Sequence, residues 1–219
     1  MKNDDKSNGE TLSKADEALF YQLLETELGG VEVYTTALDC AINEDLREEW
    51  TQYLDQTRKH VEIATRLVMA VGLDPEAQSP ARNPVHPIGE ALVKAMKEAK
   101  ESGDAGAAQR AACEAIVLAE TKDPMNWELL GEIAGRFKGE TGRMIHDAVK
   151  EVEDQEDEHL YHTKRIGTGA LAAVPGPAGR AASPGGAEGR QDGDRRPARQ
   201  EGVEGHAQDA RGLLVALLQ

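Results

Sequence analysis

Apolar residues recur every three or four positions over most of the first 166 residues, and no long stretch alternates with the period of two typical of a strand. The pattern therefore predicts an all-α chain. The first long helix begins after Ser13, a suitable N-cap, and ends before Asn43. Three further long helices and one short one are expected over about 45–71, 105–137 and 139–164, and over 88–101.

Glycine and proline residues predict where these helices break. Gly72 is a fitting end for the second long helix, and four prolines follow it between residues 74 and 87. That connection is long enough to cross from one end of a bundle to the other. The Gly29-Gly30 pair predicts a kink or a close helix crossing, and Pro124 predicts a kink. Two long helices, a crossover and two more long helices describe a four-helix bundle.

The composition changes abruptly near residue 166. Residues 167–219 hold 11 of the 22 glycines, together with 11 alanines, 6 arginines and 4 prolines, and no Phe, Trp, Tyr or Ile. Such a segment cannot bury enough apolar surface to offset its ordering entropy, so we expect disorder. Two interpretations are open: a natural Gly/Ala-rich tail, or a frameshift near 165–167, since these residues have GC-rich codons. The predicted organisation is a flexible N-terminus (1–13), a helical bundle (14–166) and a tail (167–219).

Charge and cysteine content exclude several classes of protein. The formal net charge is −15, and all of it falls in residues 1–166, because six Arg balance six acidic residues in the tail. This balance argues against binding to nucleic acid or to anionic lipid. Only two cysteines are present, and neither a signal peptide nor a 20-residue apolar run is visible. We therefore expect a soluble cytoplasmic protein that binds neither nucleic acid nor a membrane.

Five residues that can ligate a metal interrupt the apolar stripes of the four long helices. Each lies three, four or seven positions from apolar residues that are expected to face the core, so each is expected to point inward. A buried carboxylate must be paired, protonated or bound to a metal. Because carboxylate and imidazole ligands suit iron or manganese, we predict a metal site at the centre of the bundle. The five residues are Glu27, His60, Glu120, Glu156 and His159.

This arrangement resembles the ferritin-like superfamily, in which two helices give one Glu each and the other two give Glu-x-x-His. Glu27 and Glu120 match the single carboxylates, and Glu156-Asp-Glu-His159 matches one full motif. More narrowly, segments 119–127 and 151–162 resemble a bacterial group of uncharacterised ferritin-like domain proteins. The resemblance covers residues 14–166 and implies a carboxylate-bridged site for two iron or manganese ions.

The second helix departs from the family pattern, because Thr57 stands where Glu is expected, three positions before His60. The site therefore has five of six expected ligands, and it is open whether it holds two ions, one or none. Three other residues are candidates for an additional ligand or for a supporting role: Glu153, His162 and Asp123. Gln56 and Asp55 lie off the inward stripe.

The resemblance and the missing Glu at position 57 leave three functions open. The first is redox chemistry with dioxygen or peroxide, as in a ferroxidase, a peroxidase or a manganese catalase. The second is iron storage in a cage of subunits. The third is a metal-free helical bundle that serves as a structural or binding module, which the missing Glu favours. An apolar surface on a short bundle often pairs two copies, so a homodimer is also expected.

Overall fold

The computed structural model describes residues 12–172, and of residues 154, 156–158, 160 and 162–172 it describes only the backbone. The predicted flexible N-terminus (1–13) lies outside this range except for its last two residues, and so does the predicted tail (167–219) from residue 173 on, with both interpretations of its origin; residues 167–172 instead continue the last helix. The described chain is all-helical, as predicted. Its elements are α1 (Lys14–Cys40), α2 (Glu44–Ala70), the 3₁₀ turn η1 (Pro80–Arg82), α3 (His86–Glu101), α4 (Ala105–Ile133), the 3₁₀ turn η2 (Ala134–Arg136) and α5 (Gly139–Ala172).

Side-chain caps begin three of the helices. The side chains of Ser13, Asn43 and Asp104 each accept a hydrogen bond from a backbone N–H in the first turn of α1, α2 and α4. Gly72 follows α2 with a positive φ of 84°, a conformation that glycine adopts without strain. These caps and stops confirm the predicted helix ends to within a few residues. At its C-terminal end, α5 continues eight residues past the expected 164.

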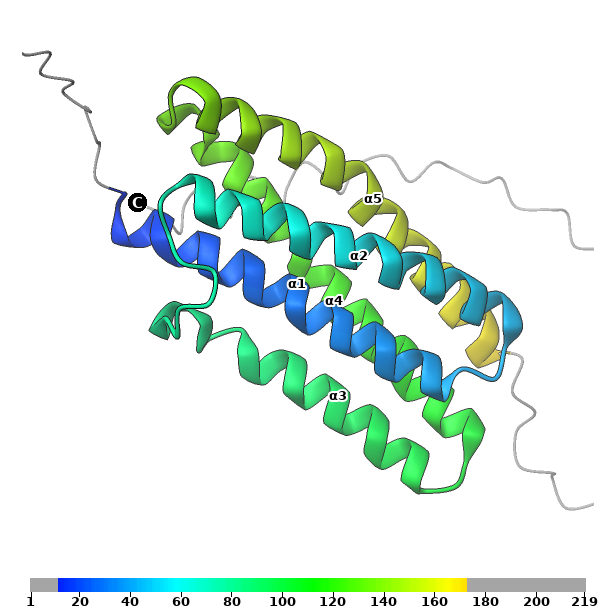
Figure 1. Ribbon diagram of the computed structural model, residues 1–219. Helices are drawn as coiled ribbons and strands as arrows, with labels where there is room; N and C mark the ends of the chain where they lie inside the picture. The colour runs from blue at the N-terminus through cyan, green and yellow to red at the C-terminus, as the bar shows by residue number, and fades with distance from the viewer. Residues whose placement is uncertain (1–11, 173–219) are drawn as a thin grey trace, which may run out of the picture. The chain divides into compact units, whose positions relative to one another are not determined.

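Four long helices form the body of the bundle, and α3 lies along one side of it (Figure 1). Helix α1 packs against α2 and α4, and α5 packs against α4 and α2. The colour gradient shows α2 and α4 running opposite to α1 and α5 (Figure 1). Helix α3, packed against α1 and α4, carries the chain back along the bundle, so the helix predicted over 88–101 makes the crossing that we expected of the proline-rich connection 74–87 (Figure 1).

Helices α1 and α4 both continue through the positions where a kink was predicted. Helix α1 runs unbroken through Gly29-Gly30, and a Cβ at Gly29 would stand 3.8 Å from the Cα of Gly89 in α3. The glycine pair therefore marks the close helix crossing that was the other expectation. Helix α4 also continues through Pro124.

The hydrophobic core divides into two clusters. One is built around Trp50 and Ile116, and the other around Phe20 and Leu67. In α1, α2 and α4 a short stretch between the two clusters carries buried polar side chains. Six buried residues, five from this stretch and His159 from α5, form what we call the polar layer: Glu27, Thr57, His60, Glu120, Asp123 and His159.

Candidate metal centre

Four of the five predicted ligands lie in the polar layer, one on each long helix. Glu27, His60 and His159 are at most 1% exposed, and Glu120 is 4% exposed. The His60 and His159 rings are stacked with their centroids 6.2 Å apart. The side chain of the fifth, Glu156, lies outside those described; its backbone is in α5, one turn before His159.

Glu27 and Glu120 each face the imidazole of the next long helix. Oε2 of Glu27 lies 3.7 Å from Nδ1 of His60, and Oε2 of Glu120 lies 3.5 Å from Nδ1 of His159. Both distances exceed that of a good hydrogen bond. Among the described residues, neither Oε2 atom accepts a hydrogen bond. Two buried carboxylate oxygens are thus aimed at imidazole nitrogens across gaps wider than a hydrogen bond.

The other oxygen of each carboxylate accepts a hydrogen bond from an aromatic side chain on the neighbouring helix. Trp127 in α4 donates its Nε1–H to Oε1 of Glu27 at 2.7 Å. Tyr34 in α1 donates its hydroxyl to Oε1 of Glu120, also at 2.7 Å. Each donor lies seven residues after the carboxylate of its own helix, so α1 and α4 exchange equivalent bonds. One oxygen of each carboxylate is held in place, and the other is left facing the centre.

Burial dominates the electrostatics of Glu27. Loss of water raises the pKa of its carboxyl above 4.5, although His60 and the Trp127 bond act in the opposite direction. The charge of Glu120 raises the same pKa further. A cation at the centre would oppose both effects, because it favours the ionised carboxylate.

The spacing within each Glu–His pair suits two ligands of one small divalent cation. Ligand nitrogen and oxygen atoms lie about 2.0–2.2 Å from a bound zinc ion, so two ligands at a tetrahedral angle stand about 3.4 Å apart. The two Glu–His separations are close to that value. Among the described side chains, however, no three His, Cys, Asp or Glu residues gather closely enough to hold one ion. Each Glu–His pair therefore offers two potential ligands, fewer than a bound ion needs.

Thr57 stands at the position where a sixth ligand was expected. It is buried in the polar layer, but its hydroxyl donates to the carbonyl of Tyr53 one turn earlier. A Cβ at Gly30 would stand 3.1 Å from its methyl carbon, so α1 packs closely on this residue. The position where the family pattern has a carboxylate is therefore filled by a methyl group and a hydroxyl that is already bonded to the helix.

The three additional candidates differ in burial and in whether their side chains are described. Asp123 is buried in α4, one turn after Glu120. Glu153 is exposed, and the structure does not bring it to the polar layer. The side chain of His162 lies outside those described.

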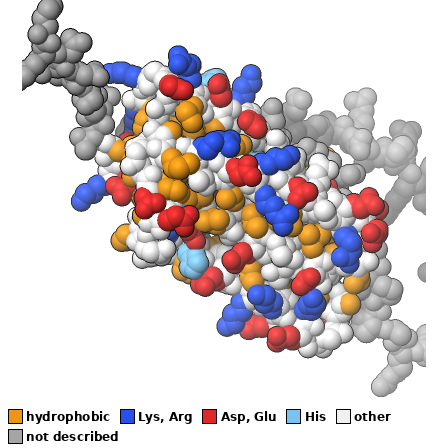
Figure 2. Space-filling view, in the orientation of Figure 1, with side chains coloured by type: hydrophobic (Ala, Val, Ile, Leu, Met, Phe, Trp, Pro, Cys, Tyr) orange, Lys and Arg blue, Asp and Glu red, His pale blue; other side chains and the backbone are white. Residues whose placement is uncertain are grey.

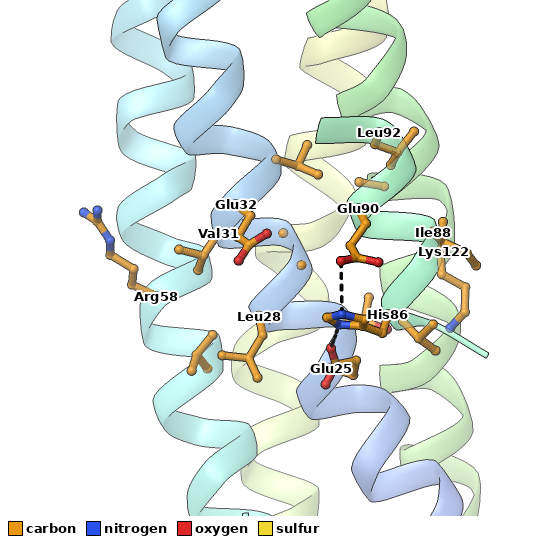
Figure 3. A pocket seen from close by; sticks show the side chains of 18 of the residues that line it. Glu25, Leu28, Val31, Glu32, Arg58, His86, Ile88, Glu90, Leu92 and Lys122 are labelled. Atoms are coloured by element: carbon orange, nitrogen blue, oxygen red, sulfur yellow. Dashed lines mark hydrogen bonds and ion pairs between the residues drawn. The ribbon is translucent and has the colours of Figure 1, made fainter. Parts of the chain in front are cut away.

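A separate groove of about 690 Å³ opens between α1, α2 and α3 (Figure 3). Leu28, Val31 and Ile88 line it, and none of the four buried ligand candidates does. On this face of the molecule hydrophobic side chains form a broken band among charged ones (Figure 2).

The ion-pair network at one end of this groove was not predicted from the sequence. Glu25 is buried and accepts a hydrogen bond from Arg82 Nη1 at 2.8 Å. It also accepts one from His86 Nδ1 at 2.6 Å (Figure 3). Glu90 lies 3.5 Å from the other ring nitrogen of His86. The hydrogen bond to Glu25 is the main reason that the pKa of His86 is raised above 6.5. No sequence signal joins these residues, because they meet only once the crossover folds onto α1.

No described helix is both long enough and apolar enough to span a bilayer. Comparison with protein-family models, with curated proteins and with solved structures found no match to this chain.

Proposed function

We propose that the chain is a ferritin-like bundle that binds iron or manganese in its polar layer. The helix order supports the proposal: two antiparallel pairs, α1–α2 and α4–α5, are joined by a crossover so that α2 and α4 run in the same direction (Figure 1). The observation that carries it is the two buried Glu–His pairs, each with a carboxylate oxygen that accepts no hydrogen bond among the described residues.

The chain's own residues would act as a rigid frame for the ion. Trp127 and Tyr34 fix the carboxylates of Glu27 and Glu120, so little reorganisation is needed when a cation enters. The surrounding hydrophobic clusters exclude bulk water and strengthen the attraction between a cation and the two carboxylates. A bound iron or manganese ion would supply redox chemistry with dioxygen or peroxide, which is the activity that we propose.

The test is the metal content of the full chain, purified without chelator and then loaded anaerobically with Fe²⁺ or Mn²⁺. We expect one or two ions per chain in the wild type, and loss of metal in Glu27→Gln and in His159→Asn. Glu25→Gln is the matched control, since Glu25 is a buried carboxylate two positions from Glu27 but belongs to the Arg82 network. Metal-free wild type after loading, or equal binding in all four proteins, would overturn the proposal.

One observation favours a second function, that of a metal-free structural or binding module. Thr57 occupies the position of a ligand, and its hydroxyl is bonded to its own helix. In that case the hydrogen bonds within the polar layer would specify how the helices pack. Unchanged thermal stability of the full chain on addition of Mn²⁺ or of a chelator is the result expected for this alternative.

A further inference from the structure

Two glutamines approach the outer side of the polar layer and bond to its histidines. The side-chain oxygen of Gln56 in α2 lies 2.9 Å from Nε2 of His159 in α5. The side-chain oxygen of Gln155 in α5 lies 3.1 Å from Nε2 of His60 in α2. Each glutamine precedes the histidine of its own helix by four residues, yet each bonds to the histidine of the other helix.

The chemistry of these bonds decides where the imidazole protons lie. An amide oxygen accepts hydrogen bonds and cannot donate them, so the ring nitrogen that faces it carries the hydrogen. In a neutral imidazole the other nitrogen then holds a lone pair. In both histidines that other nitrogen is Nδ1, the atom that faces a buried carboxylate oxygen. The lone pair and the carboxylate oxygen are both electron-rich, and a cation between them would be attracted to both.

We propose that Gln56 and Gln155 are positioning residues for the centre, each of which sets the tautomer of the histidine on the opposite helix. This inference rests on the proposed metal-binding function for its purpose, and on the two Gln–His hydrogen bonds for its geometry. The glutamines hold Nδ1 of His159 and of His60 ready to ligate. Because an amide is neutral, it orients the imidazole without the increase in basicity that a carboxylate partner gives.

The pairing crosses from one helix pair to the other. His60 belongs to the α1–α2 pair but is oriented by α5, and His159 belongs to the α4–α5 pair but is oriented by α2. The expected effect of each substitution is therefore on the opposite helix. Loss of either glutamine should disturb the histidine on the other helix and leave the histidine of its own helix as it was.

The first measurement reads the tautomers of the metal-free full chain by ¹⁵N NMR of labelled histidine. In the wild type we expect a protonated, pyrrole-type Nε2 and an unprotonated, pyridine-type Nδ1 in both His60 and His159. Gln56→Met keeps the size of the side chain and removes the acceptor, so it should mix the tautomers of His159 alone. Gln155→Met should do the same to His60 alone, and Gln56→Glu should restore a single tautomer.

A matched control is available in α4. Gln109 is also buried, and its side-chain oxygen accepts from the backbone N–H groups of Ile42 and Asn43, far along the chain from either histidine. Gln109→Met removes an equally well-bonded acceptor and should lower stability, but it should leave both imidazole spectra unchanged. A merely structural role for Gln56 and Gln155 would give the same result as this control.

The second measurement is the affinity for Mn²⁺ and Co²⁺, by calorimetry. Loss of a partner of a metal-bound histidine typically weakens binding about 10–100-fold, and we expect this loss in Gln56→Met and Gln155→Met but not in Gln109→Met. Wild-type tautomers with hydrogen on Nδ1, or tautomers that ignore both glutamines, would overturn the inference. A different result is that the tautomers change with the glutamine substitutions but the chain binds neither Mn²⁺ nor Co²⁺. That result would overturn the proposed function and would still support the positioning role of the glutamines.

Discussion

Glu27→Gln should stabilise the metal-free protein, which is unusual for a substitution at a fully buried polar residue. The wild-type carboxylate is 0% exposed, and its Oε2 accepts no hydrogen bond among the described residues. An unsatisfied buried polar atom costs about 1–3 kcal/mol. The glutamine keeps Oε1 as the acceptor for Trp127, and its amide group faces Nδ1 of His60 with hydrogens to donate. We therefore expect the free energy of unfolding to rise by about 1–3 kcal/mol.

The same substitution should remove a pH dependence. Because burial raises the pKa of Glu27 above 4.5, the folded chain binds this proton more tightly than the unfolded chain does. The wild-type free energy of unfolding should therefore fall as the pH rises from 4.5 through the folded-state pKa. Glutamine does not titrate, so this part of the slope should vanish in Glu27→Gln.

Urea denaturation of chelator-treated protein at several pH values measures both effects. With a slope of about 2 kcal/mol per molar urea, the midpoint should move up by about 0.5–1.5 M at neutral pH. The matched control, Glu25→Gln, should move it down, since Arg82 and His86 lose a charged partner. A loss of about 3 kcal/mol or more in Glu27→Gln would refute the reasoning, because that is the cost of breaking a buried ion pair with protonated His60.

Three further predictions concern other parts of the bundle. Gly142→Ala should cost about 1–3 kcal/mol or more in thermal unfolding, because its Cβ would stand 2.2 Å from the carbonyl oxygen of Phe137; an unchanged melting temperature would contradict this geometry. Burial raises the pKa of Cys113 to about 11, so its thiol should resist alkylation at pH 8 until the chain unfolds; fast labelling of the native protein would argue against it. The ion pair of His86 with Glu25 should stabilise the fold below pH 6.5, and that contribution should be lost as the pH rises through the raised pKa of His86; NMR titration of His86 in Glu25→Gln should return its pKa towards 6.5.

The helices and the inward-facing residues could be predicted because both depend on local periodicity. Glu27, His60 and Glu120 stand out as polar residues within apolar stripes, and the structure buries all three. The Gly29-Gly30 pair could be interpreted in two ways, as a kink or as a close crossing. Only the position of Gly89 on another helix decides between them.

The partners of the candidate ligands could not be predicted in the same way. Gln56 lies off the inward stripe of α2, so the pattern does not predict that it takes part in the site. It nevertheless bonds to His159, because the packing of α2 against α5 brings the edge of one helix to the centre of the other. The bond from Tyr34 to Glu120 likewise depends on the relative register of α1 and α4, which no pattern within one helix specifies.

The crossed bonds of the polar layer also have a consequence for how the two helix pairs come together. Tyr34–Glu120 and Trp127–Glu27 link α1 to α4, and two Gln–His bonds link α2 to α5. Hydrophobic packing alone tolerates a slip of one helical turn, about 5.4 Å, since one aliphatic side chain can replace another. Such a slip would break all four bonds at once and leave buried polar groups unsatisfied. The polar layer therefore favours one axial alignment of the α1–α2 and α4–α5 pairs over alignments that are shifted by one helical turn.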